Sequence, residues 1–194
     1  METKKQPKCT AFVGNRRIAS GTPPEIALSV KTASDPVLIF DDVTGEMIEM
    51  DLRGSNEEVL ARLSPPDPPM EETPRGPGRP KLGVVAREVT LLPRHWAWLN
   101  DQPGGASVAL RKLVEEASRA RVGLDRERRA REAAYRFMSA MAGNMPGFEE
   151  AIRGLFAGNF DHFRGSIQSW PADIREYALR LAEASFSGAV SLAT

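Results

Sequence analysis

The chain has 194 residues, of which 41% are hydrophobic and 27% charged, an ordinary balance for one or two globular domains. A single cysteine excludes an internal disulfide. Because the chain has only this cysteine and two histidines, its composition argues against a zinc site. No apolar run approaches the roughly 20 residues of a membrane helix, and the polar start METKKQPK leads into no apolar segment. We therefore expect a cytoplasmic protein with no membrane partner.

Charge is unevenly distributed along the chain, although the net charge is zero. Residues 1–72 carry 8 basic and 13 acidic side chains, residues 75–131 carry 13 and 6, and residues 132–194 carry 5 and 7. A basic centre between acidic flanks is typical of a protein with an anionic partner. The alternative is that the helices of this region have solvated faces of Arg and Glu.

Residues 1–63 predict a small α/β domain with the element order ββαββα. Its first half is a hairpin around the turn dipeptide Gly14-Asn15, followed by a helix from Thr22 through about Ala33. Thr22 is the expected cap of this helix, with prolines in its first turn.

The second half of this domain repeats the pattern. The apolar run 37–40 predicts a buried strand, and the alternation over 46–52 predicts its hairpin partner. A capping box formed by Ser55 and Glu58 then begins a helix to Leu63. The hairpin holds several acidic residues, which suggest either a solvated turn or a metal site, and no calcium-loop pattern is present: Asp41, Asp42, Glu46, Glu49 and Asp51.

Residues 64–83 form a linker with seven prolines between Pro65 and Pro80, a composition that favours extended polyproline II. It ends in Gly78-Arg79-Pro80-Lys81, preceded by Arg75, and this resembles the AT-hook. The resemblance implies that the arm lies in the minor groove of A·T-rich DNA, with Arg75, Arg79 and Lys81 on the phosphates or in the groove. Pro77 interrupts the usual contiguous motif.

The segment 84–120 predicts a strand, a short helix, a glycine turn and a second helix. Val84 to Leu92 is a β-branched run that ends at Pro93, the first helix covers 94–101, the turn is Pro103-Gly104-Gly105-Ala106-Ser107, and the second helix covers 108–117. This order resembles the ribbon-helix-helix family. The resemblance implies a homodimer whose paired strands enter the major groove of duplex DNA.

Candidate DNA contacts follow from that resemblance. Arg87 and Thr90 lie on the expected ribbon, and Arg94 and the backbone amide of Ser107 are the expected phosphate ligands. Two registers stay open: if Leu92 points into the core, Arg87 faces DNA, and if Leu91 does, Thr90 faces DNA with Glu88. A further alternative is that the segment is a dimerisation or interdomain helical hairpin.

Residues 121–194 predict a helical module. A helix covers 121–143 and buries a stripe of Ala134, Phe137, Met138 and Met141, and three further helices lie within 146–187. Phe156, Phe160, Phe163 and Trp170 are the expected aromatic core of these helices.

The whole chain, from TAFVGNRRIASG through LPRHWAWLNDQPGGASVALRKLVEEA to WPADIREYALRLA, resembles a bacterial family known as domain of unknown function family 2239. We interpret the protein as α+β, with a small N-terminal domain, a proline-rich linker, a ribbon-helix-helix-like centre and a C-terminal helical module. The sequence favours a dimeric DNA-binding regulator of transcription. The alternative is a non-enzymatic interaction or dimerisation module. No catalytic constellation, metal pattern or cofactor motif is present, so we expect no enzyme activity and no cofactor.

Overall fold

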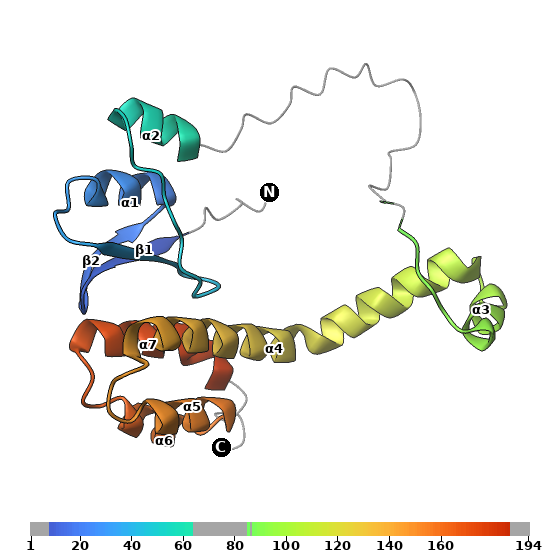
Figure 1. Ribbon diagram of the computed structural model, residues 1–194. Coiled ribbons are helices and arrows are strands. Elements are labelled where there is room, and N and C mark those ends of the chain that lie inside the picture. Colours follow the sequence, from blue (N-terminus) through green and yellow to red (C-terminus); the bar gives the residue numbers. More distant parts are fainter. Residues whose placement is uncertain (1–7, 64–84, 86, 187–194) are drawn as a thin grey trace. The chain divides into compact units, whose positions relative to one another are not determined.

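The computed structural model describes residues 8–63, 85 and 87–186 (Figure 1). In these residues the protein is of the α+β class, with a small antiparallel sheet and seven α-helices. The chain divides into a first unit, Met1–Pro65 with Gly123–Thr194, and a second unit, Pro66–Val122. Helix α4, Gly105–Ala142, has residues in both units.

The sheet of the first unit has the order β2-β1-β3 and is antiparallel throughout. Its strands are β1 (Cys9–Val13), β2 (Arg16–Gly21) and β3 (Val37–Asp41). The turn between β1 and β2 contains Gly14 at a φ of 52°, a conformation that favours glycine. The predicted first hairpin and the predicted buried strand are confirmed.

The predicted fourth strand over 46–52 is wrong. Met47 forms an isolated bridge with Phe40, and the described residues that follow it belong to no strand. The alternating apolar side chains still reach the core beside β3: Ile48, Met50 and Leu52. The ladder ends because the Asp51 carboxylate accepts the backbone amide of Arg53 at 3.1 Å and its side-chain Nε at 2.8 Å, a local turn that competes with strand pairing.

Two cores lie on the two faces of the sheet, because successive side chains of a strand point to opposite sides. One face packs against α1 (Pro23–Val30), and its buried residues are Cys9, Ala11, Ile26, Val30 and Ile39. The other face contributes Phe12 and Phe40 to the core of the C-terminal helices. Figure 1 shows the sheet between α1 on one side and α4 with α7 on the other.

Both predicted helices of the N-terminal segment are confirmed, and each begins with a carboxylate that binds the chain before it. In α1 the Glu25 side chain accepts the backbone amide of Thr22 at 2.8 Å. In α2 (Asn56–Leu63) the Glu58 side chain accepts the amide of Ser55 at 2.7 Å, and Glu58 donates its own amide to the Ser55 hydroxyl at 3.2 Å. The second arrangement is the predicted capping box.

The C-terminal helices agree with the prediction in number and place. They are α5 (Phe148–Phe156), α6 (Phe160–Ser166) and α7 (Ala172–Ala182), followed by a 3-10 turn, η1 (Glu183–Phe186). Asn159 caps α6 by accepting the amide of His162 at 3.0 Å.

The two helices predicted over 108–117 and 121–143 are one continuous helix, α4. No proline lies between them, and Gly123 is accommodated within the helix. The C-terminal half of α4 buries the predicted stripe, with Ala134, Phe137 and Met138 fully buried.

An aromatic cluster links the sheet to these helices. The ring centroid of Phe137 lies 5.5 Å from Phe12, 5.0 Å from Phe40 and 4.5 Å from Tyr177. The predicted aromatic core of the C-terminal helices is correct for Phe163 and Trp170, which are buried, and wrong for Phe156 and Phe160, which are exposed. The Phe156 ring packs edge-on against Tyr135 at the surface instead of against the buried core. Within the described ranges, no helix combines the length and hydropathy that a membrane span requires.

Candidate nucleic-acid interface

The described residues 87–92 of the second unit, which lead into α3 (Pro93–Asn100), are not a strand. In residues 85 and 87–92, the described part of the strand predicted over 84–92, the single chain forms no strand, and no other described strand pairs with them. Arg87 and Thr90 are exposed here, as are Val89 at 53% and Leu92 at 48%. The two possible ribbon registers would bury Leu91 or Leu92, and in this chain Leu91 is half-buried and Leu92 exposed.

Helix α3 begins where the sequence predicts. Leu92 is its N-cap residue, Pro93 is its first residue, and Arg94 follows with an exposed side chain. The Leu92 carbonyl accepts the amides of His95 at 2.9 Å and Trp96 at 3.2 Å. Arg94 is thus held in the first helical turn.

The glycine turn before α4 exposes the start of that helix. Gly104 and Gly105 have φ values of 88° and 75°. The Gly105 amide donates to the Gln102 carbonyl at 2.9 Å, whereas the glycine before the helix offers no side chain to cap the amides of Ala106 and Ser107. Ser107 lies in this first turn and is exposed, and its carbonyl accepts Arg111 Nε at 3.0 Å.

Several cations of this segment have no acidic partner. Among the described residues, Arg87, Arg94, Lys112 and Arg121 form no ion pair, whereas Arg119 pairs with Glu115. Unpaired surface cations can neutralise phosphates without first breaking an internal contact.

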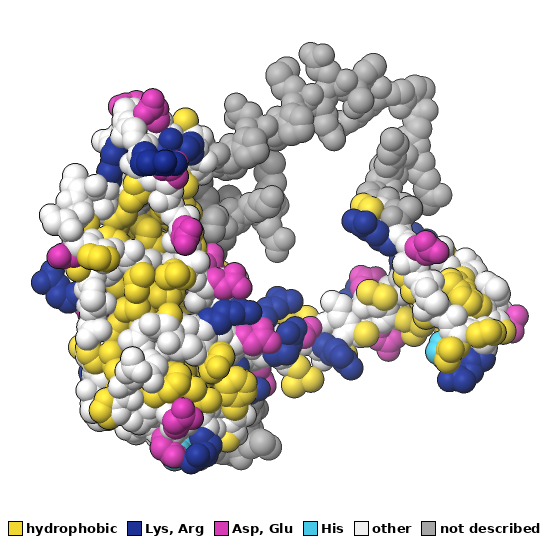
Figure 2. Space-filling model, in the orientation of Figure 1, with side chains coloured by type: hydrophobic (Ala, Val, Ile, Leu, Met, Phe, Trp, Pro, Cys, Tyr) yellow, Lys and Arg dark blue, Asp and Glu magenta, His cyan; other side chains and the backbone are white. Residues whose placement is uncertain are grey.

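Apolar side chains are exposed beside these cations. Trp96 is 37% exposed and Trp98 50%, and Figure 2 shows yellow side chains at the surface around α3. Leu99 and Ala109 are the buried hydrophobic residues of the second unit in the described ranges. Arg75, Arg79 and Lys81, the predicted contacts of the arm, lie outside the described residues.

A polar cluster in the first unit was not predicted. One carboxylate oxygen of Asp42 accepts the Thr10 hydroxyl at 2.7 Å and the Tyr177 hydroxyl at 2.9 Å, and lies 3.0 Å from the Arg180 guanidinium. The Thr10 hydroxyl is also within 2.9 Å of the Ser20 hydroxyl. The acidic pattern was visible in the sequence, but Tyr177 and Arg180, which bind Asp42, lie more than 130 residues further along the chain.

The environment of this cluster keeps its neighbours protonated. Burial raises the pKa of Tyr177, and the charge of Asp42 and the hydrogen bond to it raise that pKa further. Burial, with the charges of Asp41 and Asp42, also raises the pKa of Cys9 to about 11. A protonated tyrosine donating to a carboxylate stabilises the contact between the sheet and α7, and this explains the cluster without a catalytic role.

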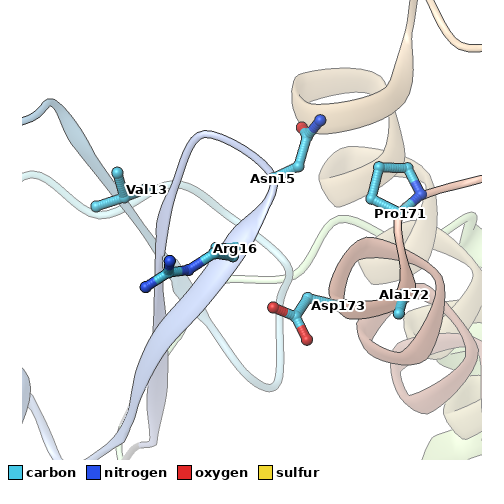
Figure 3. A pocket seen from close by; sticks show the side chains of 6 residues that line it. All are labelled: Val13, Asn15, Arg16, Pro171, Ala172 and Asp173. Carbon is cyan, nitrogen blue, oxygen red and sulfur yellow. The ribbon is translucent and has the colours of Figure 1, made fainter.

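A hollow of about 410 Å³ lies between the first hairpin and the start of α7 (Figure 3), lined by Val13, Asn15, Arg16, Pro171, Ala172 and Asp173. Figure 3 shows the Arg16 guanidinium directed away from Asp173. The Asp173 carboxylate accepts the backbone amide of Arg17 at 2.8 Å, and Arg17 also pairs with Glu176 at 3.3 Å. These contacts of Asp173 and Arg17 join the first hairpin to α7 at the edge of the hollow.

Metal ligands do not gather in the described residues, where no group of three or more His, Cys, Asp or Glu side chains could hold an ion. Three of the acidic residues predicted to lie in the second hairpin have other partners: Asp42 binds Tyr177 and Arg180, Asp51 binds Arg53, and Asp41 accepts local backbone amides.

The chain matches no curated protein and no solved structure. One family model matches residues 8–182, which include the β-hairpin, the strand-helix-helix segment and the C-terminal helices. Because this match covers most of the 194 residues, the chain belongs to the family described as uncharacterized protein conserved in bacteria (DUF2239).

Proposed function

We propose that the protein is a homodimeric DNA-binding protein that regulates transcription, and that it contacts duplex DNA through its strand-helix-helix segment and the basic arm before it. The observation that carries this proposal is the surface of residues 87–121. It exposes apolar side chains such as Val89, Trp98 and Val114 together with cations that form no ion pair in the described residues: Arg87, Arg94, Lys112 and Arg121.

Self-association is the first step. The extended residues 87–92 have backbone groups that no described strand pairs, and both Val89 and Leu92 are about half exposed. A second copy of the same segment would pair as an antiparallel strand, satisfy these groups and cover one of the two leucine registers. This is the arrangement that the resemblance to ribbon-helix-helix proteins implies.

DNA contact is the second step. A two-fold ribbon would present Arg87 or Thr90 twice, depending on the register. Arg94 and the first-turn amides of α4 at Ser107 would then hold phosphates on either side, since both are exposed and free of acidic partners in the described residues. Arg75, Arg79 and Lys81 add cations from the arm.

The test is the affinity of the full-length protein for duplex DNA across a salt series, for the native chain and for Arg87→Ala and Arg94→Ala. We expect the logarithm of the binding constant to fall linearly with the logarithm of salt concentration. Each substitution that removes a phosphate contact should reduce that slope by about one. Thr90→Ala tests the register, since Thr90 and Arg87 face opposite sides of the ribbon.

Arg164→Ala is the matched control, because Arg164 is an exposed arginine of α6 that forms no ion pair in the described residues. It removes the same charge from the other unit and should leave the slope unchanged. An absence of binding at low salt would contradict the proposal, and the exposed surface would then be assigned to a protein partner.

A further inference from the structure

The N-terminal half of α4 carries an apolar stripe with the spacing of a two-stranded coiled coil. Leu110, Leu113, Ala117 and Ala120 recur at alternating intervals of three and four residues, and Val114 lies beside them. Leu113 is 43% exposed and Val114 65% exposed, and Ala117 and Ala120 are exposed as well. Leu110 is half-buried, and from Leu113 onward the stripe is an exposed helix face in the described residues.

The charged residues that flank the stripe indicate what covers it. Glu116 and Arg121 lie on its two edges, five residues apart, and neither forms an ion pair in the described part of the chain. Glu115, which points away from the stripe, is paired with Arg119 one turn later in the same helix. Within the described residues, Glu116 and Arg121 are thus unpaired ions of opposite charge on the two edges of the apolar face.

Heptad geometry identifies the partner. With Leu110 and Ala117 at the a positions of the heptad and Leu113 and Ala120 at the d positions, Glu116 occupies a g position and Arg121 an e position. In a parallel, in-register pair of helices, each g residue faces the e residue five positions later in the partner helix. Glu116 of each copy would then face Arg121 of the other, which gives two new ion pairs about the two-fold axis. A copy of α4 in this orientation is the occupant whose charges match both edges of the stripe.

We infer that two copies of this protein associate through a parallel, in-register pairing of the Leu110–Arg121 face of α4. This deepens the proposed function and rests on its homodimer, but not on its DNA binding. Parallel pairing places the two N-termini of α4 at the same end of the dimer, which is where two phosphate contacts on one duplex require them. The stripe is only about 18 Å long at 1.5 Å per residue, so it adds to other dimer contacts.

Cysteine cross-linking of the full-length protein without DNA tests the orientation. Leu113→Cys and Ala117→Cys, made separately, should each form a covalent dimer under mild oxidation or with a short bifunctional thiol reagent. In an antiparallel pair, at most one of the two positions lies at the two-fold axis. Glu115→Cys is the control on the outer side of the helix. The native chain controls for Cys9, which is fully buried.

Charge reversal tests the partner. Glu116→Lys and Arg121→Glu should each weaken dimerisation roughly threefold to tenfold, as measured by sedimentation equilibrium, and the double variant should restore it to within about twofold. Glu115→Lys with Arg119→Glu is the matched pair and should leave dimerisation unchanged.

The outcomes separate this inference from the proposed function. A monomeric protein, or cross-linking at only one of the two stripe positions, overturns the parallel pairing, and the DNA affinities of Arg87→Ala and Arg94→Ala still decide DNA binding. Cross-linking at both positions with no DNA binding supports the pairing and contradicts the proposed function.

Discussion

The two units of this protein differ in how much of their apolar surface the chain itself covers. In the first unit, Phe12, Phe40, Phe137 and Tyr177 are fully buried and in mutual ring contact. In the second unit, Leu99 and Ala109 are the buried hydrophobic residues of the described ranges, while two tryptophans and the α4 stripe are exposed. Exposed apolar patches of this kind mark interaction surfaces. The comparison indicates that intramolecular packing completes the first unit, and it supports the proposal that another molecule covers the second.

The largest effect on the first unit should come from Gly45→Ala. Gly45 is buried at a φ of 66°, and a Cβ atom there would lie 2.1 Å from the carbonyl oxygen of Ala133 in α4. The turn after β3 would have to move away from α4, and the core beneath it would open. We expect a loss of about 4 kcal/mol in the free energy of unfolding, measured by urea denaturation.

Gly14→Ala separates the backbone cost of that substitution from the clash. Gly14 also has a positive φ, of 52°, but nothing lies within 4 Å of the Cβ position. Its substitution should cost about 1 to 2 kcal/mol, from the left-handed conformation alone. Equal losses for the two variants would show that the Gly45 turn is not seated on α4.

The polar cluster should give the next largest effect. Asp42→Ala removes the acceptor of Thr10 and Tyr177 and leaves the Arg180 guanidinium without its carboxylate. We expect a loss of about 2 kcal/mol in the free energy of unfolding, since the Asp42 side chain is only 14% exposed and its removal leaves two hydroxyl donors without an acceptor, while solvent screens the half-exposed Arg180. Glu176→Ala removes a carboxylate from an exposed ion pair of the same helix and should have little effect. Similar losses would contradict the role assigned to Asp42.

Local signals in the sequence predicted the helices well and the contacts between them poorly. The Ser55–Glu58 capping box marks a helix start because its hydrogen bonds lie within one turn of the chain. The sheet core depends on Phe12 meeting Phe137, and no local pattern encodes a contact between residues so far apart in sequence. The alternation over 46–52 predicted the buried face correctly but not the missing ladder, which depends on a turn at Asp51.

The candidate interface was predicted in part for a similar reason. The sequence placed α3, the glycine turn and the start of α4, and the structure shows Arg87, Thr90, Arg94 and Ser107 exposed there. The predicted strand is not formed, because a strand depends on a partner that neither periodicity nor a single chain supplies. The sequence predicted two helices, over 108–117 and 121–143, where the structure has the single helix α4.

Alkaline pH should weaken the first unit through Cys9. The pKa of Cys9 is raised from 9.0 to about 11, by burial and then by Asp41 and Asp42. Between these values the unfolded chain releases the thiol proton and the folded chain keeps it, so stability is complete below pH 9 and falls as the pH rises to 11. The loss is at most about 2 to 3 kcal/mol. The raised pKa of Tyr177 acts with the same sign at higher pH.

The free energy of unfolding at pH 8 and pH 11, for the native chain and for Cys9→Ala, measures this contribution. The variant is expected to be less stable at pH 8, because it loses buried volume, but to lose less stability between the two pH values. An equal loss in both proteins would show that the thiol does not ionise differently in the two states, and the alkaline loss would then be attributed to Tyr177.

The smallest effect should come from Trp98→Ser in the second unit. The Trp98 side chain is 50% exposed, so its removal should change the free energy of unfolding by no more than about 0.5 kcal/mol. Phe137 is fully buried, and Phe137→Ala should lower the free energy of unfolding by about 3 to 5 kcal/mol. The comparison is informative when repeated across protein concentrations. A penalty for Trp98→Ser that grows with concentration would mean that a second copy buries the indole, because association stabilises the folded state by mass action. A penalty as large as that of Phe137→Ala at every concentration would mean that the chain itself buries Trp98, and the contrast between the two units would fail.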